Sequence, residues 1–280
     1  MTTKKIKLAD IAKEVGCSIA TVSYVLNNDP KQKINEETRR KILQVSSILG
    51  YQKNTIANAL ATGKSNCIGF YIGSSFFPLA TTDKFNFFSE IVEALALNGY
   101  HSILLAGSIS KEVPFVDAII CIDFSEENFI TVCSNNIIPV IGIDTHVHEP
   151  WIFEISSDIS DIRERYYIDD YILFSYDLNS SNLKNDIVKN NENTYFISSF
   201  VQLEMISKQL QNKKIVVCGD SMYDYLKGTN NEIIKYSIDN NKKINKLISC
   251  LKLAIDHTEA DCHVYKINWF QTASSKCPLV

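Results

Sequence analysis

The chain has 280 residues, a formal net charge of −4 and 45% hydrophobic residues, a composition that excludes a disordered protein. No apolar run approaches 18 residues and no basic-plus-apolar leader is present, so we expect a cytoplasmic protein and neither a membrane-spanning nor a secreted one. The eight cysteines form no C-x-x-C pair, which predicts reduced, mostly buried thiols and neither disulfides nor a zinc site.

The charge is divided unevenly along the chain. Residues 1–66 contain 11 Lys/Arg and 5 Asp/Glu, a net charge of +6, while the remainder contains 17 basic and 27 acidic residues, a net of −10. A basic amino-terminal part on an acidic body is expected when only that part approaches the phosphates of a nucleic acid.

The first two predicted helices form a helix-turn-helix. Apolar residues at helical spacing predict a short helix from Leu8 to Val15, and Gly16 permits the left-handed backbone of a sharp turn. Ser18 is a good N-cap for a second helix, whose buried face contains Val22 and Val25. The alternative is an ordinary helical bundle, but turn, cap and spacing together favour the DNA-binding motif.

A third helix follows a polar loop. Asn35 is its expected N-cap, Glu36 and Glu37 lie in its first turn, and Gly50 is its expected end. We expect the head to occupy residues 1–52 and a short linker segment, too small to be a stable helix in isolation, to occupy residues 53–65.

With these elements the chain resembles the lactose/galactose repressor family of bacterial transcription regulators. The matching residues are Asp10-Ile11-Ala12, Val15-Gly16, Ser18, Thr21-Val22-Ser23, Val25-Leu26-Asn27, Thr38-Arg39, Gly50-Tyr51, Asn54, Ala57 and Leu60. The resemblance implies that residues 53–65 are a hinge helix and that Leu60 is a wedge in the minor groove, where it would unstack a base step. The alternative for Leu60 is an ordinary apolar contact in a linker.

The resemblance also implies which residues contact DNA. Ile19, Ala20 and Tyr24 take the positions that read bases. The other contacts that it implies are Lys7, Leu8, Ser18, Thr21, Ser23, Asn27, Lys33, Thr38, Tyr51, Asn54, Ala57 and Leu60. Tyr24 stands where relatives commonly have arginine, so we expect an operator that departs from the commonest family consensus.

The body, residues 66–280, alternates short apolar strands with helices, which predicts parallel sheets with right-handed crossovers. The predicted strands are 67–72, 101–105, 116–121, 139–143, 151–155, 171–176, 195–198, 215–218, 233–238 and 263–267, and the predicted helices are 83–98, 126–135, 181–190, 200–211 and 241–257. By the resemblance, this is an effector-binding and dimerisation core of two subdomains, like a periplasmic sugar-binding protein, with a truncated second subdomain at about 160–280.

Ligands of open parallel sheets bind at the carboxyl ends of the strands. This position selects Ser74, Ser75, Phe76 and Asp144, and the resemblance adds Asp220. For Asp144, a loop aspartate that caps local backbone is an equal alternative. The core lacks the family's Arg-x-x-Gly-Phe and Gly-Tyr-Asp-Asp segments, and Gly219 replaces a usual polar residue. A sugar or phosphosugar effector, a protein co-repressor and no effector therefore all stay open.

Enzymatic interpretations have little support. None of the glycine-rich nucleotide loops, nucleophile elbows or His-Glu-x-x-His patterns occurs, and no cofactor is expected. His146-Val147-His148-Glu149 is the one metal-like cluster, and solvated loop side chains are its commoner interpretation. We therefore expect a DNA-binding repressor of carbohydrate-use genes, associated with the nucleoid, that binds a pseudo-palindromic operator as a homodimer. The alternative from another class is a ligand sensor whose DNA binding has decayed.

Overall fold

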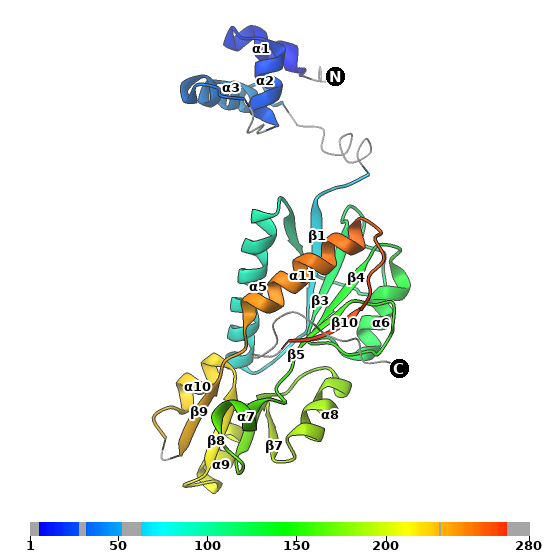
Figure 1. Ribbon diagram of the computed structural model, residues 1–280. Coiled ribbons are helices and arrows are strands. Elements are labelled where there is room, and N and C mark those ends of the chain that lie inside the picture. Colours follow the sequence, from blue (N-terminus) through cyan, green and yellow to red (C-terminus); the bar gives the residue numbers. More distant parts are fainter. Residues whose placement is uncertain (1–5, 28–31, 52–62, 230, 268–280) are drawn as a thin grey trace. The chain divides into compact units, whose positions relative to one another are not determined.

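The computed structural model describes residues 6–27, 32–51, 63–229 and 231–267 (Figure 1). The chain divides into two compact units, residues 1–65 and residues 66–280. Among the described residues, no helix is both long enough and apolar enough to cross a membrane.

The first unit contains three helices, α1 (Leu8–Val15), α2 (Ile19–Leu26) and α3 (Glu36–Ile48). The predicted caps are confirmed: the Ser18 hydroxyl accepts from the Thr21 amide, and the Asn35 side chain accepts from the Glu37 amide. Gly16 has a φ of 78° at the end of α1, as the sharp turn requires. One small apolar core, centred on the fully buried Ile11, Val22 and Ile42, holds the three helices together.

The second unit begins with a six-stranded parallel sheet in the order β10-β5-β4-β3-β1-β2. Its strands are β1 (Cys67–Ile72), β2 (His101–Leu104), β3 (Ala118–Ile122), β4 (Val140–Ile143), β5 (Glu154–Ser157) and β10 (Val264–Ile267). Helices α5 (Pro78–Leu97) and α11 (Asn240–Ile255) pack on one face, and α6 (Glu126–Asn135) packs on the other. These elements form the first subdomain.

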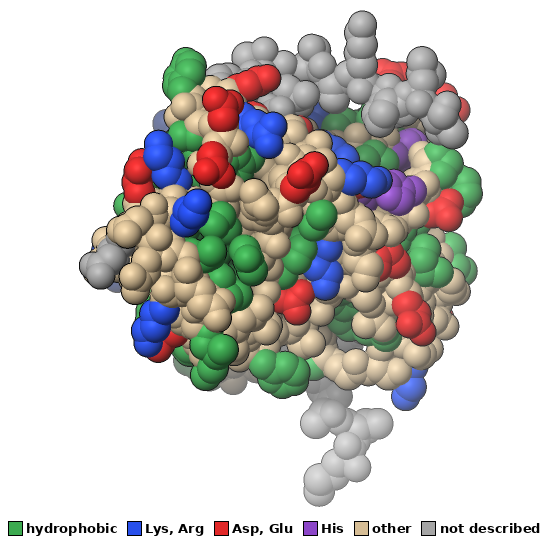
Figure 2. Space-filling model, turned by 90° about the horizontal axis from the view of Figure 1, so that it is seen from below, with side chains coloured by type: hydrophobic (Ala, Val, Ile, Leu, Met, Phe, Trp, Pro, Cys, Tyr) green, Lys and Arg blue, Asp and Glu red, His purple; other side chains and the backbone are tan. Residues whose placement is uncertain are grey.

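The second subdomain is a four-stranded parallel sheet in the order β7-β6-β8-β9. Its strands are β6 (Ile172–Tyr176), β7 (Thr194–Ile197), β8 (Lys214–Cys218) and β9 (Glu232–Tyr236). Helices α7 (Ile162–Tyr166) and α8 (Ser181–Asn190) pack on one face, and α9 (Phe200–Gln209) and α10 (Asp220–Leu226) pack on the other. Figure 2 looks at this end of the molecule, where the coloured Lys/Arg and Asp/Glu side chains are interspersed, unlike a basic surface for DNA phosphates.

Helix α5 joins the cores of the two subdomains. Ile91 and Leu95 in its carboxyl half are buried against the first sheet, whereas Ala80 near its start and the preceding Phe77 are buried against the second. Figure 1 shows α5 running from the first subdomain down to the side of α10. Any separation of the subdomains would therefore expose Phe77 to water.

The structure corrects three expectations from the sequence. Helix α5 begins at Pro78 and not at Asp83, because proline is well suited to a first helical turn. Helix α7 was not predicted, since five residues are too few to show a helical period. The range of about 160–280 expected for the second subdomain is too long, because β10 pairs in parallel with β5 and α11 covers the first sheet.

Candidate functional site

Helix α2 separates its buried and exposed side chains cleanly. Val22 and Val25 are buried in the core of the head, whereas Ile19 is 52% exposed and Tyr24 is 37% exposed. Ala20 is exposed beside Ile19. The helix thus presents an apolar surface with one phenolic hydroxyl, which suits contacts with thymine methyl groups better than a bidentate grip on guanine.

Polar groups surround this surface. The Ser18 and Thr21 hydroxyls lie 2.8 Å apart, and the Asn27 side chain donates to the Ser23 hydroxyl at 3.2 Å. Lys7 and Lys33 are exposed, as phosphate contacts require, while Leu8, Thr38 and Tyr51 are half-buried. Asn54, Ala57 and Leu60 lie outside the described residues.

A cavity of about 540 Å³ lies between the two subdomains, at the carboxyl ends of strands from both sheets. Its lining includes Asp144 and Asp220, two of the residues predicted to face an effector. The structure does not place Ser74, Ser75 or Phe76 in this lining, and Phe76 is 99% exposed. At Gly73, directly after β1, the chain passes so close to Asp123 that a Cβ atom would collide with the Asp123 backbone oxygen.

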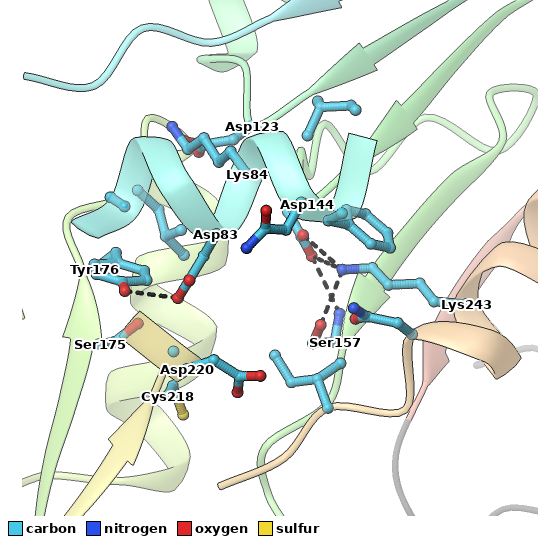
Figure 3. A pocket seen from close by; sticks show the side chains of 18 of the residues that line it. Asp83, Lys84, Asp123, Asp144, Ser157, Ser175, Tyr176, Cys218, Asp220 and Lys243 are labelled. Atoms are coloured by element: carbon cyan, nitrogen blue, oxygen red, sulfur yellow. Dashed lines mark hydrogen bonds and ion pairs between the residues drawn. The ribbon is translucent and has the colours of Figure 1, made fainter. Parts of the chain in front are cut away.

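Asp144 is paired within the chain. The Lys243 Nζ atom lies 2.7 and 2.6 Å from its two carboxylate oxygens and 3.0 Å from the Ser157 Oγ atom (Figure 3). Lys243 comes from α11 and its side chain is 3% exposed, so the ammonium is satisfied by these partners and by the Phe87 ring, 5.0 Å away. A ligand that bound the Asp144 carboxylate would have to compete with this lysine.

Asp123, after β3, is also paired. Its carboxylate forms an ion pair with Lys84 of α5 and accepts from the backbone amide of Asn179 at 2.8 Å. Burial raises the pKa of Asp123, and Lys84 opposes that shift. Both Asp123 and Asp144 have a φ of 50°, a left-handed conformation that aspartate adopts more readily than most residues.

The opposite side of the cavity is formed by Asp83, Tyr176 and Gly219. The Tyr176 hydroxyl donates to Asp83 at 2.7 Å, and burial together with this hydrogen bond raises the pKa of Tyr176 (Figure 3). Gly219 has a φ of 131°, and a Cβ atom there would lie 2.5 Å from the Tyr176 ring. Glycine at position 219 therefore makes room for this tyrosine.

The His146 and His148 rings lie with their centroids 4.0 Å apart and are tilted by 41° relative to each other. His146 Nε2 lies 3.4 Å from Glu154 and Nδ1 lies 3.2 Å from Asp186 of α8. Burial lowers the pKa of His146 to about 4 and raises that of Glu154 to about 7. In the described parts of the chain, no group of three or more His, Cys, Asp or Glu residues could hold a metal ion.

The sequence prediction missed most of the residues that line the cavity. Lys84, Asp123 and Lys243 have charged partners far away in sequence, so no local pattern marks them as a site. Asp123 could have been predicted from its position, because it directly follows a buried strand, as Asp144 does.

Comparison with known proteins agrees with this architecture. Residues 7–54 match the family model for bacterial regulatory proteins of the lacI family. Catabolite control protein A of Streptococcus mutans is 33% identical over 107 residues, which cover 38% of this chain and 30% of that protein. The match therefore spans less than a third of the relative's own length.

Solved structures extend the likeness to the core. A lac repressor dimer bound to operator and the anti-inducer ONPF is 16% identical, with a TM-score of 0.60 over 94% of this chain and 96% of that chain. The transcriptional regulator CelR in complex with cellobiose is 10% identical, with a TM-score of 0.52 over 94% and 97%. Residues 7–54 thus match the lacI-family model, and the core has the fold seen in the lac repressor.

Proposed function

From the lacI-family head and the repressor-like core, we propose that this protein is a sequence-specific DNA-binding transcription regulator that represses carbohydrate-use genes inside the bacterial cell. The observation that carries the proposal is the outward face of α2, where Ile19, Ala20 and Tyr24 are exposed over a fully packed three-helix core. Helices in this position of a helix-turn-helix enter the major groove. The net charge of +6 on residues 1–66 supplies the attraction to phosphate.

The proposed regulator acts as a homodimer on a pseudo-palindromic operator, because one small head makes few contacts and two-fold symmetry requires mirrored half-sites. The core offers a surface for this pairing. Phe85 and Leu97 of α5 are exposed, as are Ile103 and Leu104 of the neighbouring edge strand β2. These exposed apolar side chains lie on two elements that contact each other, and we propose them as the site of pairing. In the proposed complex, Leu60 of each linker enters the minor groove as a wedge.

The cavity is the proposed place for any small-molecule effector. CelR, a regulator of similar fold, was solved in complex with cellobiose, which supports a sugar as the ligand class. The pairing of Asp144 with Lys243 favours the second candidate, a regulator that responds to a protein co-repressor or to no effector. Sugar hydroxyls need free hydrogen-bonding groups, and these charges already have partners.

Gel-shift titration of the full chain, at stated salt concentrations, tests the proposal. We expect its own upstream DNA to bind at least about a thousandfold more tightly than random DNA, as specific regulators do. Equal affinity for the two DNAs would contradict a repressor. A panel of sugars and phosphosugars added to the specific complex then distinguishes the two modes of control. A severalfold change in affinity with one sugar identifies effector control, and no change favours the second candidate.

A further inference from the structure

Glu126 belongs to the first subdomain but caps a helix of the second. It is the first residue of α6, and its carboxylate accepts hydrogen bonds from the Ser180 hydroxyl at 2.6 Å and from the backbone amides of Asn182 at 2.9 Å and Ser181 at 3.2 Å. All three donors lie at the start of α8. Although partial burial opposes ionisation, these hydrogen bonds lower the pKa of Glu126, so the group is an anion at neutral pH.

Asp123 makes a second connection beside the first. Its Oδ1 atom accepts from the Asn179 backbone amide at 2.8 Å, and its Oδ2 atom accepts from the Asn179 side chain at 3.0 Å. The same side-chain amide also donates to the backbone oxygens of Asp123 at 3.0 Å and Ser74 at 3.1 Å. Asn179 therefore satisfies acceptors from two strand ends of the first subdomain, immediately before α8 begins.

Asp83 makes a third connection on the other side of the cavity. The Ser221 amide, in the first turn of α10, lies 3.1 and 3.2 Å from its two carboxylate oxygens, and the Ser221 and Tyr176 hydroxyls donate to it as well. Asp83 lies one helical turn beyond Ala80, which is buried in the second core. The start of α5 is thus held against the second subdomain by both polar and apolar contacts.

These three carboxylates lie where a ligand would be expected in a protein of this fold. In open parallel sheets, ligands bind beyond the carboxyl ends of the strands, where helix amino termini attract negative charge. Here the amino-terminal amides of α8 and α10 already donate hydrogen bonds to the protein's own Glu126 and Asp83. We propose that the core closes on itself, with Asp83, Asp123 and Glu126 in the role that an anionic or hydroxyl-rich ligand has in a hinged cleft.

A core closed in this way has one dominant arrangement of its subdomains with or without a small molecule. A ligand shifts a conformational equilibrium only by its difference in affinity for the two states, and the closed state here is held by contacts within the chain. Opening would remove from Asp83, Asp123 and Glu126 the hydrogen bonds that they accept from the amides of Asn179, Ser181, Asn182 and Ser221, although Asp123 would keep its ion pair with Lys84. This inference concerns the core alone, so it can fail while the proposed DNA binding stands, and the reverse.

Hydrogen exchange of the full chain, without added ligand, tests the inference. We expect slow exchange of the amides at the start of α8 in the wild type, and exchange about tenfold faster in Glu126→Ala, as for the loss of a hydrogen bond to a charged group. Glu127→Ala is the matched control, because Glu127 is also in the first turn of α6 but is exposed. Glu126→Gln keeps the shape of the side chain and removes the charge, so it gives an intermediate rate even if the alanine variant folds poorly.

Two results would overturn the inference. One is fast exchange at Ser181 and Asn182 in the wild type that slows only when a sugar or phosphosugar is added, since the cleft would then be open until a ligand closes it. The other is equal exchange in the wild type, Glu126→Gln and Glu127→Ala. Small-angle scattering gives a second readout, with an unchanged radius of gyration on adding the sugar panel as the supporting result and a contraction as the contrary one.

Discussion

The Lys243 ammonium and the Asp144 carboxylate form a close ion pair in the wall of the cavity, with both Nζ–O distances under 2.8 Å. The lysine side chain is 3% exposed and the aspartate side chain is 23% exposed, so the two ends of the pair differ in their access to water. Loss of the anion leaves a buried cation, whereas loss of the cation leaves an anion that water can reach.

This asymmetry predicts unequal effects of two variants. Asp144→Asn should lower the free energy of unfolding by about 3 kcal/mol, because it leaves the buried ammonium without its anionic partner. Lys243→Met should lower it by about 1 kcal/mol. Urea unfolding followed by circular dichroism measures the free energy of unfolding of each variant. The double variant should be more stable than Asp144→Asn alone, and equal losses for both single variants would contradict the account of the pair.

Phe77 should matter for stability and its neighbour should not. Phe77 is 2% exposed in the second core, while Phe76 is 99% exposed. Phe77→Ala should lower the free energy of unfolding by about 3–5 kcal/mol, as for other buried phenylalanines, and Phe76→Ala should change it by less than about 0.5 kcal/mol. The same urea unfolding experiment measures both. A small effect of Phe77→Ala would mean that the start of α5 does not belong to the second core.

Gly219 and Gly228 offer a similar comparison. Alanine at Gly219 meets the Tyr176 ring at 2.5 Å with a φ of 131°, whereas alanine at Gly228 meets nothing within 4 Å. We expect Gly219→Ala to lower the free energy of unfolding by about 2–4 kcal/mol, because a side chain is strained in this conformation and crowds the ring. Gly228→Ala should lower it by less than about 1 kcal/mol. Thermal unfolding of the two variants in parallel tests this, and equal midpoints would show that Tyr176 can move aside.

Because of Glu154, we expect the free energy of unfolding to depend on pH. Burial raises its pKa in the folded protein to about 7 from an ordinary value of 4.5, so the folded state retains a proton that the unfolded state loses between these values. The contribution of Glu154 to the free energy of unfolding is highest below pH 4.5. It falls as the pH rises and reaches its minimum above pH 7. Glu154→Gln should therefore raise the free energy of unfolding at pH 8 by up to about 2 kcal/mol and change it little at pH 5.

His146 also makes the stability depend on pH, but its contribution has the opposite sign to that of Glu154. Burial lowers its pKa to about 4 from 6.5, so this group destabilises the folded state progressively as the pH falls from 6.5 towards 4. At pH 8 the histidine is neutral in both the folded and the unfolded state, so the benefit of Glu154→Gln measured there belongs to Glu154. A benefit of the substitution that is as large at pH 5 as at pH 8 would contradict the assignment to Glu154.

The sequence predicted those parts of the structure that depend on local patterns. Gly16, Ser18 and Asn35 determine turns and caps through their own backbone and side-chain chemistry, so the three helices of the head were predicted from them. The strands of both sheets were also predicted within a few residues, because buried parallel strands are short apolar runs. Their assignment to sheets was less accurate, since the pairing of β10 with β5 joins residues more than a hundred positions apart.

The cavity was harder to predict for the same reason. Asp144 was selected by its place after a strand, but its partner Lys243 lies 99 residues away on a helix that looks ordinary in the sequence. Glu126 was predicted only as the first residue of a helix, although its donors lie on the other subdomain. Contacts between elements distant in sequence decide whether a polar residue faces a ligand or another part of the chain.

The central claim is that the exposed face of α2 reads base pairs in a symmetric operator, and selection of binding sites from random DNA tests it most directly. The wild type should enrich a two-fold symmetric sequence, and Tyr24→Arg should enrich a different one, with guanine favoured by about 1–3 kcal/mol at the base pair that Tyr24 faces. Leu43→Ala, which changes an exposed residue on α3, is the control and should leave the sequence unchanged. Failure to enrich any symmetric sequence, or the same sequence from wild type and Tyr24→Arg, would contradict the claim.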